Sequence, residues 1–154
     1  MILGEYHRLL DERHRLSIPT DLVQGLGGVE ELLLVKERPG ALSLWNARQW
    51  QPRWKQGLEL IERKVQAGRL VDRLGDVQLW GRLLSTRQRT IRLAQRGRLL
   101  IPEGFREFLG VEAGGSVMVV GAALCVEIWH PENWCQHLAT EIPKFRDLED
   151  NLST

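Results

Sequence analysis

The stretch Arg15-Leu16-Ser17-Ile18-Pro19 returns later in the chain as Arg98-Leu99-Leu100-Ile101-Pro102, and this pair decides the fold. Both stretches are short and apolar-rich, which is typical of a β-strand. Each ends on a proline, a residue that suits the first position of a helix. Recurrence of this kind within one chain indicates two copies of one structural unit.

The surroundings of the two stretches match as well. Each copy reads in the same order: a basic hairpin loop, a strand, Ile-Pro, a short helix, a glycine, two strands and a Trp-x4-Trp pattern. A chance origin is a poor explanation for the whole ordered series. The matched pairs include Arg13 with Arg96, Arg15 with Arg98, Gly27 with Gly110, Trp45 with Trp129 and Trp50 with Trp134.

A unit of this length buries too little apolar surface to be stable alone, so we expect the copies to pack on each other. The predicted fold is α+β, mainly β, with a pseudo-twofold β-barrel-like core and flanking helices. Between the copies, Trp54, Leu58, Ile61 and Val65 recur at helical spacing, which indicates a helical connector. The predicted boundaries are 3–52 for the first repeat, 53–84 for the connector, 85–134 for the second repeat, and 135–154 for a C-terminal helix with a tail disordered beyond Asp147.

Composition and motifs exclude several classes of protein. No apolar run is long enough for a membrane span, and the N-terminus does not resemble a signal peptide. His130, Cys135 and His137 lack the spacing of a metal site and an acidic partner for nucleophilic catalysis. No glycine-rich loop carries the Lys and Ser/Thr of a phosphate-binding motif. We therefore expect no enzyme activity, no cofactor, no metal and no small-molecule substrate.

The distribution of charge points to nucleic acid, although the net charge is only +1. Residues 77–102 contain no Asp or Glu and hold six arginines. A solvated face is the alternative for such a segment, since charge clustering alone discriminates poorly. The repeat favours nucleic-acid binding over a solvated face, because an arginine pair recurs at both predicted hairpin tips. The pairs are Arg13 with Arg15 and Arg96 with Arg98.

Arginine presents a planar fork that grips a phosphate or a guanine edge. Pseudo-twofold pairing of the copies would set all these arginines on one surface, suited to double-stranded DNA. Asp11 precedes Arg15 by four residues and has two possible roles, which the sequence leaves open. Its carboxylate could fix the guanidinium by a bidentate bond, or it could cap the backbone of the turn.

These motifs together resemble the MraZ family, whose members carry a D-x-x-x-R signature in each of two SpoVT-AbrB-like, swapped-hairpin repeats. Residues 11–19 look like the first signature, residues 95–111 look like the second, and the resemblance spans roughly residues 3–134. Two positions depart from the family pattern. Ala94 replaces the second Asp, and His14 stands where Gly is usual, so the two loops are expected to contribute unequally.

The resemblance implies a cytoplasmic, nucleoid-associated transcriptional regulator that binds short direct repeats upstream of the division and cell-wall gene cluster. It also implies a homo-oligomer, with the basic hairpins presented on a ring. The expected DNA-binding residues are Arg13, Arg15, Arg96, Arg98, Asp11 and His14. The alternative is an oligomeric assembly module of AbrB-like, antitoxin-type fold, for which Trp54 and Trp80 are the candidate interface residues.

Overall fold

The computed structural model describes residues 1–28 and 31–154, and it confirms a mixed α+β fold dominated by antiparallel strands. The strands are β1 (Ile2–Leu9), β2 (Arg15–Ser17), β3 (Leu32–Arg38), β4 (Ala41–Asn46), β5 (Gln88–Ile91), β6 (Arg98–Leu100), β7 (Ser116–Ala123) and β8 (Val126–Trp129). The helices are α1 (Thr20–Gly25), α2 (Ala47–Gln66), α3 (Leu74–Arg87), α4 (Phe105–Leu109), α5 (Pro131–Glu141) and α6 (Phe145–Ser153), with short 3-10 turns η1 (Val71–Arg73), η2 (Gln95–Gly97) and η3 (Ile142–Lys144).

The main sheet has the order β1-β7-β8-β4-β3-β5. This order reads the same from either end when the two repeats are exchanged, because β1, β7 and β8 correspond to β5, β3 and β4. The first strand of each repeat pairs with the other repeat: β1 lies antiparallel to β7, and β5 lies antiparallel to β3. At the centre, β4 pairs with β8 across the two repeats. Separating the repeats would therefore break the sheet in three places.

The barrel-like closure expected from the sequence is not confirmed. Among the described residues the six-stranded sheet is open, with β1 and β5 at its edges. Strands β2 and β6 form a separate two-stranded sheet instead of closing the larger one. Each of these two strands is three residues long, and the two pair with each other.

One continuous hydrophobic core joins the two repeats. Repeat-equivalent side chains enter it in pairs, since Leu16 and Leu99 are both fully buried and Ile18 and Ile101 lie beside them. Helix α1 adds Leu22 to this core, and α4 adds Phe105 at the equivalent position. The sequence pattern thus buries the same face of each unit against the other unit.

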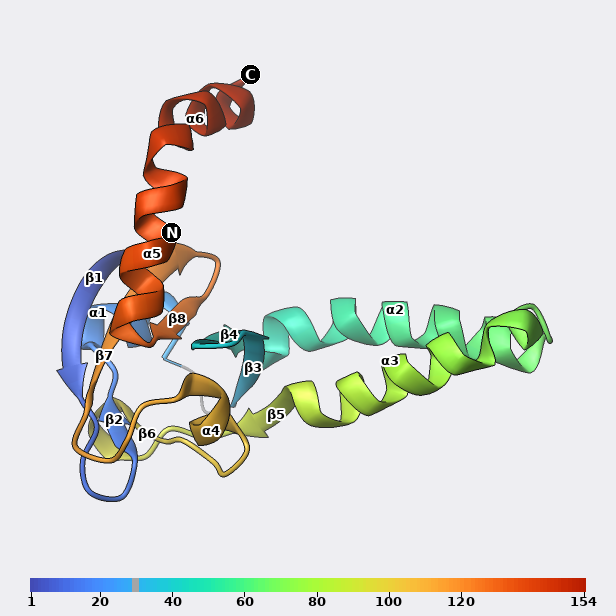
Figure 1. Cartoon of the computed structure of the whole chain (residues 1–154), viewed down its shortest axis with the longest axis horizontal. Coiled ribbons are helices and arrows are strands. Elements are labelled where there is room, and N and C mark those ends of the chain that lie inside the picture. Colours follow the sequence, from blue (N-terminus) through green and yellow to red (C-terminus); the bar gives the residue numbers. More distant parts are fainter. Residues whose placement is uncertain (29–30) are drawn as a thin grey trace.

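Two helical arms leave this body in different directions (Figure 1). Helices α2 and α3 form a long antiparallel hairpin, and α5 continues through η3 into α6 as a second arm. Helix α2 begins at Ala47, within the stretch assigned to the first repeat, because the Asn46 side chain caps it by accepting a hydrogen bond from the Gln49 N–H at 3.0 Å. None of the described helices combines the length and apolar character needed to cross a membrane.

The C-terminal tail differs from the expectation of disorder beyond Asp147. Residues Phe145–Ser153 form helix α6. The segment after Pro143 contains neither glycine nor proline, and its apolar residues Phe145, Leu148 and Leu152 share one helical face. Both properties favour a helix over an irregular tail.

Candidate nucleic-acid interface

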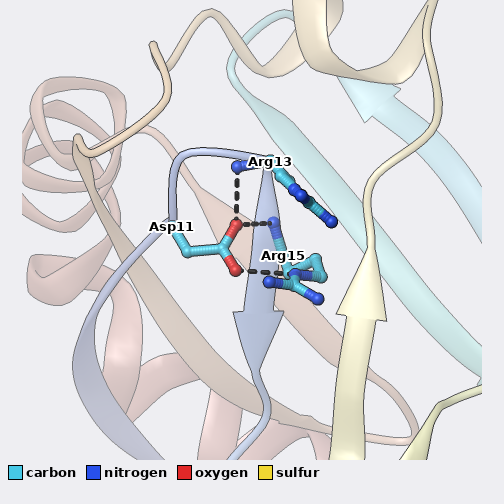
Figure 2. A network of polar contacts seen from close by, with 3 residues as sticks. All are labelled: Asp11, Arg13 and Arg15. Carbon is cyan, nitrogen blue, oxygen red and sulfur yellow. Dashed lines mark hydrogen bonds and ion pairs between the residues drawn. The ribbon is translucent and has the colours of Figure 1, made fainter.

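Asp11 organises the first hairpin loop with both of its carboxylate oxygens (Figure 2). Oδ1 accepts hydrogen bonds from the backbone N–H groups of Arg13 and Arg15, at 2.8 Å and 2.9 Å. Oδ2 accepts from Nε of Arg15 at 2.7 Å. The carboxylate therefore caps the turn, and it also contacts the guanidinium, through a single hydrogen bond from Nε and not through the bidentate bond that the sequence suggested.

The electrostatics of this loop agree with its geometry. The pKa of Asp11 falls from its ordinary 3.8 to about 2, chiefly because its ionised form accepts the hydrogen bond from the Arg15 N–H. Asp11 is thus a carboxylate throughout the physiological range. The contact to Arg15 uses Nε, one of five N–H donors on the guanidinium, so the terminal nitrogens are available to another acceptor.

The second loop keeps the backbone frame of the first and lacks its carboxylate. The Ala94 N–H donates to the Arg98 carbonyl at 2.8 Å, as the Asp11 N–H does to the Arg15 carbonyl at 3.0 Å. The methyl group of Ala94 cannot accept hydrogen bonds from the loop. Arg98 therefore has no counterpart of the Asp11 carboxylate to orient it, and its guanidinium is expected to move more freely than that of Arg15.

The backbone at the two tips also differs. His14 adopts φ 57°, so this position has the left-handed conformation that glycine would allow, and histidine accepts it. In the second loop both Arg96, at φ 63°, and Gly97, at φ 67°, are left-handed. A Cβ on Gly97 would meet Val23 and the Ile18 carbonyl at 3.1 Å and 3.2 Å, so the tight approach of the other repeat also requires glycine there.

Strands β2 and β6 join the two loops into one surface. They pair antiparallel with Leu16 opposite Leu99 and with Arg15 opposite Leu100. Each tip is also held by the other repeat, since the His14 carbonyl accepts from the Ile101 N–H at 3.1 Å and the Gly97 carbonyl accepts from the Ile18 N–H at 3.0 Å. The loops are thus fixed relative to each other by backbone hydrogen bonds.

The strand alternation sorts the side chains of this ladder by face. Leu16 and Leu99 point into the core and are fully buried. The opposite face, which we call the β2–β6 face, presents Arg15, Ser17, Arg98 and Leu100. Arg15 and Arg98 are diagonal neighbours on it, at a spacing of about 7 Å by the geometry of antiparallel pairs.

The structure places the six predicted residues in two groups. Arg15 and Arg98 come together on the β2–β6 face, where Arg98 is exposed and Arg15 is half-buried. Arg13 and Arg96 are exposed in the loops at opposite ends of this ladder, so the cationic surface is extended along it. Asp11 accepts hydrogen bonds from the backbone of the first loop, and His14 supplies the left-handed residue of that loop.

Two residues of this face were not singled out from the sequence. Ser17 pairs with Arg98 across the ladder, and Leu100 pairs with Arg15. Leu100 is 53% exposed, which is unusual for a leucine in a short strand beside a core. The alternation in residues 15–17 and 98–100 could have revealed both, because side chains two apart on a strand share a face.

Of the residues that the sequence discounted for catalysis, His137 packs against an aromatic side chain. The His137 ring lies 4.8 Å from that of Trp129, centre to centre, and its Nδ1 is 3.4 Å from an Arg38 guanidinium nitrogen. Cys135 is exposed. In the part of the chain that the structure describes, no three His, Cys, Asp or Glu side chains gather as a metal-binding group.

Comparison with known families gives a match over the second half of the chain. Residues 87–153 match the model of a family described as "MraZ protein, putative antitoxin-like". This segment contains the second loop, β6, α4, the β7–β8 pair and the C-terminal arm.

Whole-chain similarity extends to proteins named transcriptional regulator MraZ. The one from Acetivibrio thermocellus is 28% identical over 153 residues, which cover 99% of this chain and 97% of that protein. The one from Syntrophomonas wolfei is 27% identical over 152 residues, covering 99% and 96%. A third, from Thermomicrobium roseum, is 29% identical over 146 residues, covering 93% of each chain.

Proposed function

We propose that this chain is a member of the MraZ family, to whose proteins it is similar over nearly its whole length, and that it is a sequence-specific DNA-binding transcriptional regulator. In this proposal it contacts double-stranded DNA through the β2–β6 face. Its relatives are named as regulators of transcription and not as enzymes. The observation that carries the proposal is the juxtaposition of Arg15 and Arg98 on the β2–β6 face. Arg15 and Arg98 come from distant parts of the chain and share one exposed face.

The geometry of this face suits a duplex. A two-stranded β-ribbon fits the major groove, where arginine reads guanine through O6 and N7. Arg13 and Arg96 lie beyond the two ends of the ladder, and in this proposal they contact phosphates on either side. Asp11 pre-orients Arg15, which lowers the entropy lost when that side chain binds.

The proposed target is a set of short direct repeats upstream of the division and cell-wall gene cluster, with the protein acting at the nucleoid in the cytoplasm. We also propose that several copies assemble into a ring, each divided into repeats 3–52 and 85–134. One β2–β6 face makes few contacts, and tethered copies raise the overall affinity through effective concentration. Regularly spaced faces match regularly repeated DNA sites.

A pure assembly module of the same fold is the second candidate. The half-buried Trp54 and Trp80 of the α2–α3 hairpin favour self-association, but they do not account for the arginine loops. An assembly module has no need of two repeat-equivalent arginines, Arg15 and Arg98, on one face with a further loop arginine at each end of the ladder. The β2–β6 face therefore favours the DNA-binding function, with assembly as a property of the same protein.

The direct test is binding to DNA from upstream of the protein's own gene, compared with scrambled DNA of equal length across a salt series. The variant Arg15→Ala/Arg98→Ala is expected to lose selectivity and to weaken binding about tenfold or more. Replacement of Arg13 or Arg96, the proposed phosphate contacts, is expected instead to lower the slope of log affinity against log salt by about 1 for each.

A matched control is Arg63→Ala/Arg69→Ala, which removes the same charge from exposed positions near the tip of the α2–α3 hairpin. This control is expected to bind selectively, like the wild-type protein. Absence of binding at low salt, or equal binding by the β2–β6 variant and the wild type, would refute the proposed function.

A further inference from the structure

The hairpin of α2 and α3 holds an apolar groove on its surface. Two tryptophans, one from each helix, take part in it, and its volume is about 630 Å³. Leu58, on α2, is 38% exposed within this groove. A groove between two helices with aromatic and aliphatic walls is the usual seat of an amphipathic helix. Its apolar walls are Trp54, Leu58, Ile61, Trp80 and Leu84.

The far end of the C-terminal arm presents an amphipathic helix of the required kind. On α6, Phe145 is 65% exposed, Leu148 is 55% exposed and Leu152 is 79% exposed. Their spacing of three and four residues puts them on one face. Figure 1 shows α6 at the tip of the arm, away from the sheet and from the α2–α3 hairpin. This apolar face is therefore open to a partner.

The charges around the two surfaces are complementary. The lining of the groove includes the cations Arg53, Lys55 and Arg87, and it includes no carboxylate among the described residues. Helix α6 carries three carboxylates against a single arginine. Such complementarity favours one partner and one orientation over others. The carboxylates are Asp147, Glu149 and Asp150.

The chain's own α6 cannot fill its own groove in this fold. The arm and the hairpin leave the sheet in different directions (Figure 1), and α5 is held to the body by Trp134, whose Nε1 donates to Glu5 at 2.7 Å. We infer that α6 of one copy lies in the α2–α3 groove of a second copy. This inference deepens the self-association included in the proposed function and rests on it.

Such a contact is heterologous, because the groove and the helix are different surfaces. Each copy offers one of each, so the contact repeats from copy to copy and ends only in a ring or a chain. Truncating α6 or blocking the groove would therefore reduce the assembly to monomers. An interface formed by one surface on itself would instead stop at dimers.

The first experiment measures molar mass against protein concentration by sedimentation velocity, without DNA. Leu148→Glu is expected to raise the concentration for half-assembly about tenfold or more. Leu148 is 55% exposed in the single copy, and the variant replaces the apolar surface that the groove of a second copy would bury with a charged group that is costly to desolvate. Leu124→Glu is the matched control, since Leu124 is also 55% exposed and lies in the β7–β8 connection. The control is expected to assemble like the wild type.

A charge exchange tests the pairing of the two surfaces. Asp147→Lys/Asp150→Lys on the helix and Arg53→Glu/Lys55→Glu on the groove are each expected to prevent assembly. A chain that carries both sets of changes, or an equimolar mixture of the two variants, is expected to recover it. The inference would be overturned if neither the combined chain nor the mixture recovers assembly. It would also be overturned if the wild type is monomeric at every concentration, or if Leu148→Glu assembles as well as the wild type.

The molar-mass measurement and the DNA-binding measurement test the two proposals independently. Assembly that responds to these variants without any DNA binding would refute the regulator and leave the α6–groove contact standing. Selective DNA binding by a protein that stays monomeric would refute the α6–groove contact and leave the DNA-binding regulator standing.

Discussion

The replacement Leu99→Ala tests how the two repeats are joined beneath the β2–β6 face. Leu99 is fully buried and lies opposite Leu16, which is also fully buried. Removing a buried leucine loses its transfer free energy and leaves a cavity, at a cost of 2–5 kcal/mol in known cases. For a site closed by another repeat, with little room to collapse, we expect about 3 kcal/mol. In a chain of this size, that loss lowers Tm by about 6–12 °C.

The assay is chemical and thermal unfolding followed by circular dichroism. The neighbouring replacement Leu100→Ala is the control, because Leu100 is 53% exposed on the opposite face and should change stability by less than about 0.5 kcal/mol. The double replacement of Leu16 and Leu99 should cost less or more than the sum by about 0.5–3 kcal/mol, as contacting residues do. Equal stability of the Leu99 and Leu100 variants would refute a core that joins the repeats through this pair.

Three further predictions follow from single groups. The pKa of Asp11 is lowered from 3.8 to about 2, chiefly by the hydrogen bond from the Arg15 N–H, so its contribution to stability is present above about pH 4 and is lost as pH falls toward 2. The loop amide NMR shifts should therefore show a titration step near pH 2 that Asp11→Asn abolishes, and a step that persists in the variant would contradict the assignment. Burial raises the pKa of Cys125 to about 12, so a thiol reagent at pH 8 should modify only the exposed Cys135 in the native protein, as mass spectrometry would show; modification of both cysteines would speak against this packing. A Cβ at Gly121 would lie 2.6 Å from a backbone oxygen of β1, so Gly121→Ala should destabilise the chain by about 1–3 kcal/mol in denaturant unfolding, and a neutral effect would argue against the β1–β7 pairing.

The repeat in the sequence predicted the fold class and the inward residues well. Leu16 and Leu99, and Ile18 and Ile101, occupy equivalent buried positions because the same apolar pattern occurs twice. The sequence also predicted the helices after Pro19 and Pro102, since α1 and α4 follow there. These properties depend on residues close together in the chain.

Long-range pairing lay beyond the sequence pattern. The open order of the main sheet depends on β1 meeting β7 and β5 meeting β3, and the alternation within each strand does not specify its partner. The tail was expected to be disordered beyond Asp147, and the structure has helix α6 there. An apolar face with no partner inside its own chain is hard to recognise when one copy is considered alone.

The sequence predicted which arginines belong to the candidate site, but it predicted only part of their arrangement in space. The equal spacing of Arg13–Arg15 and Arg96–Arg98 located both loops. The diagonal approach of Arg15 to Arg98 follows from the register of β2 with β6, which pairs residues far apart in the chain. Ala94 was recognised as a departure, and the structure shows the retained backbone hydrogen bond that keeps the loop closed without the carboxylate.

The central claim is that DNA lies against the β2–β6 face, and NMR chemical-shift mapping tests it most directly. Duplex DNA containing the upstream direct repeats would be added to labelled protein, and the backbone amides and arginine Nε groups would be followed. The account predicts the largest changes within residues 11–17 and 94–100, with little change at the tip of the α2–α3 hairpin. Changes confined to the hairpin or the C-terminal arm, with residues 11–17 and 94–100 unaffected, would contradict it.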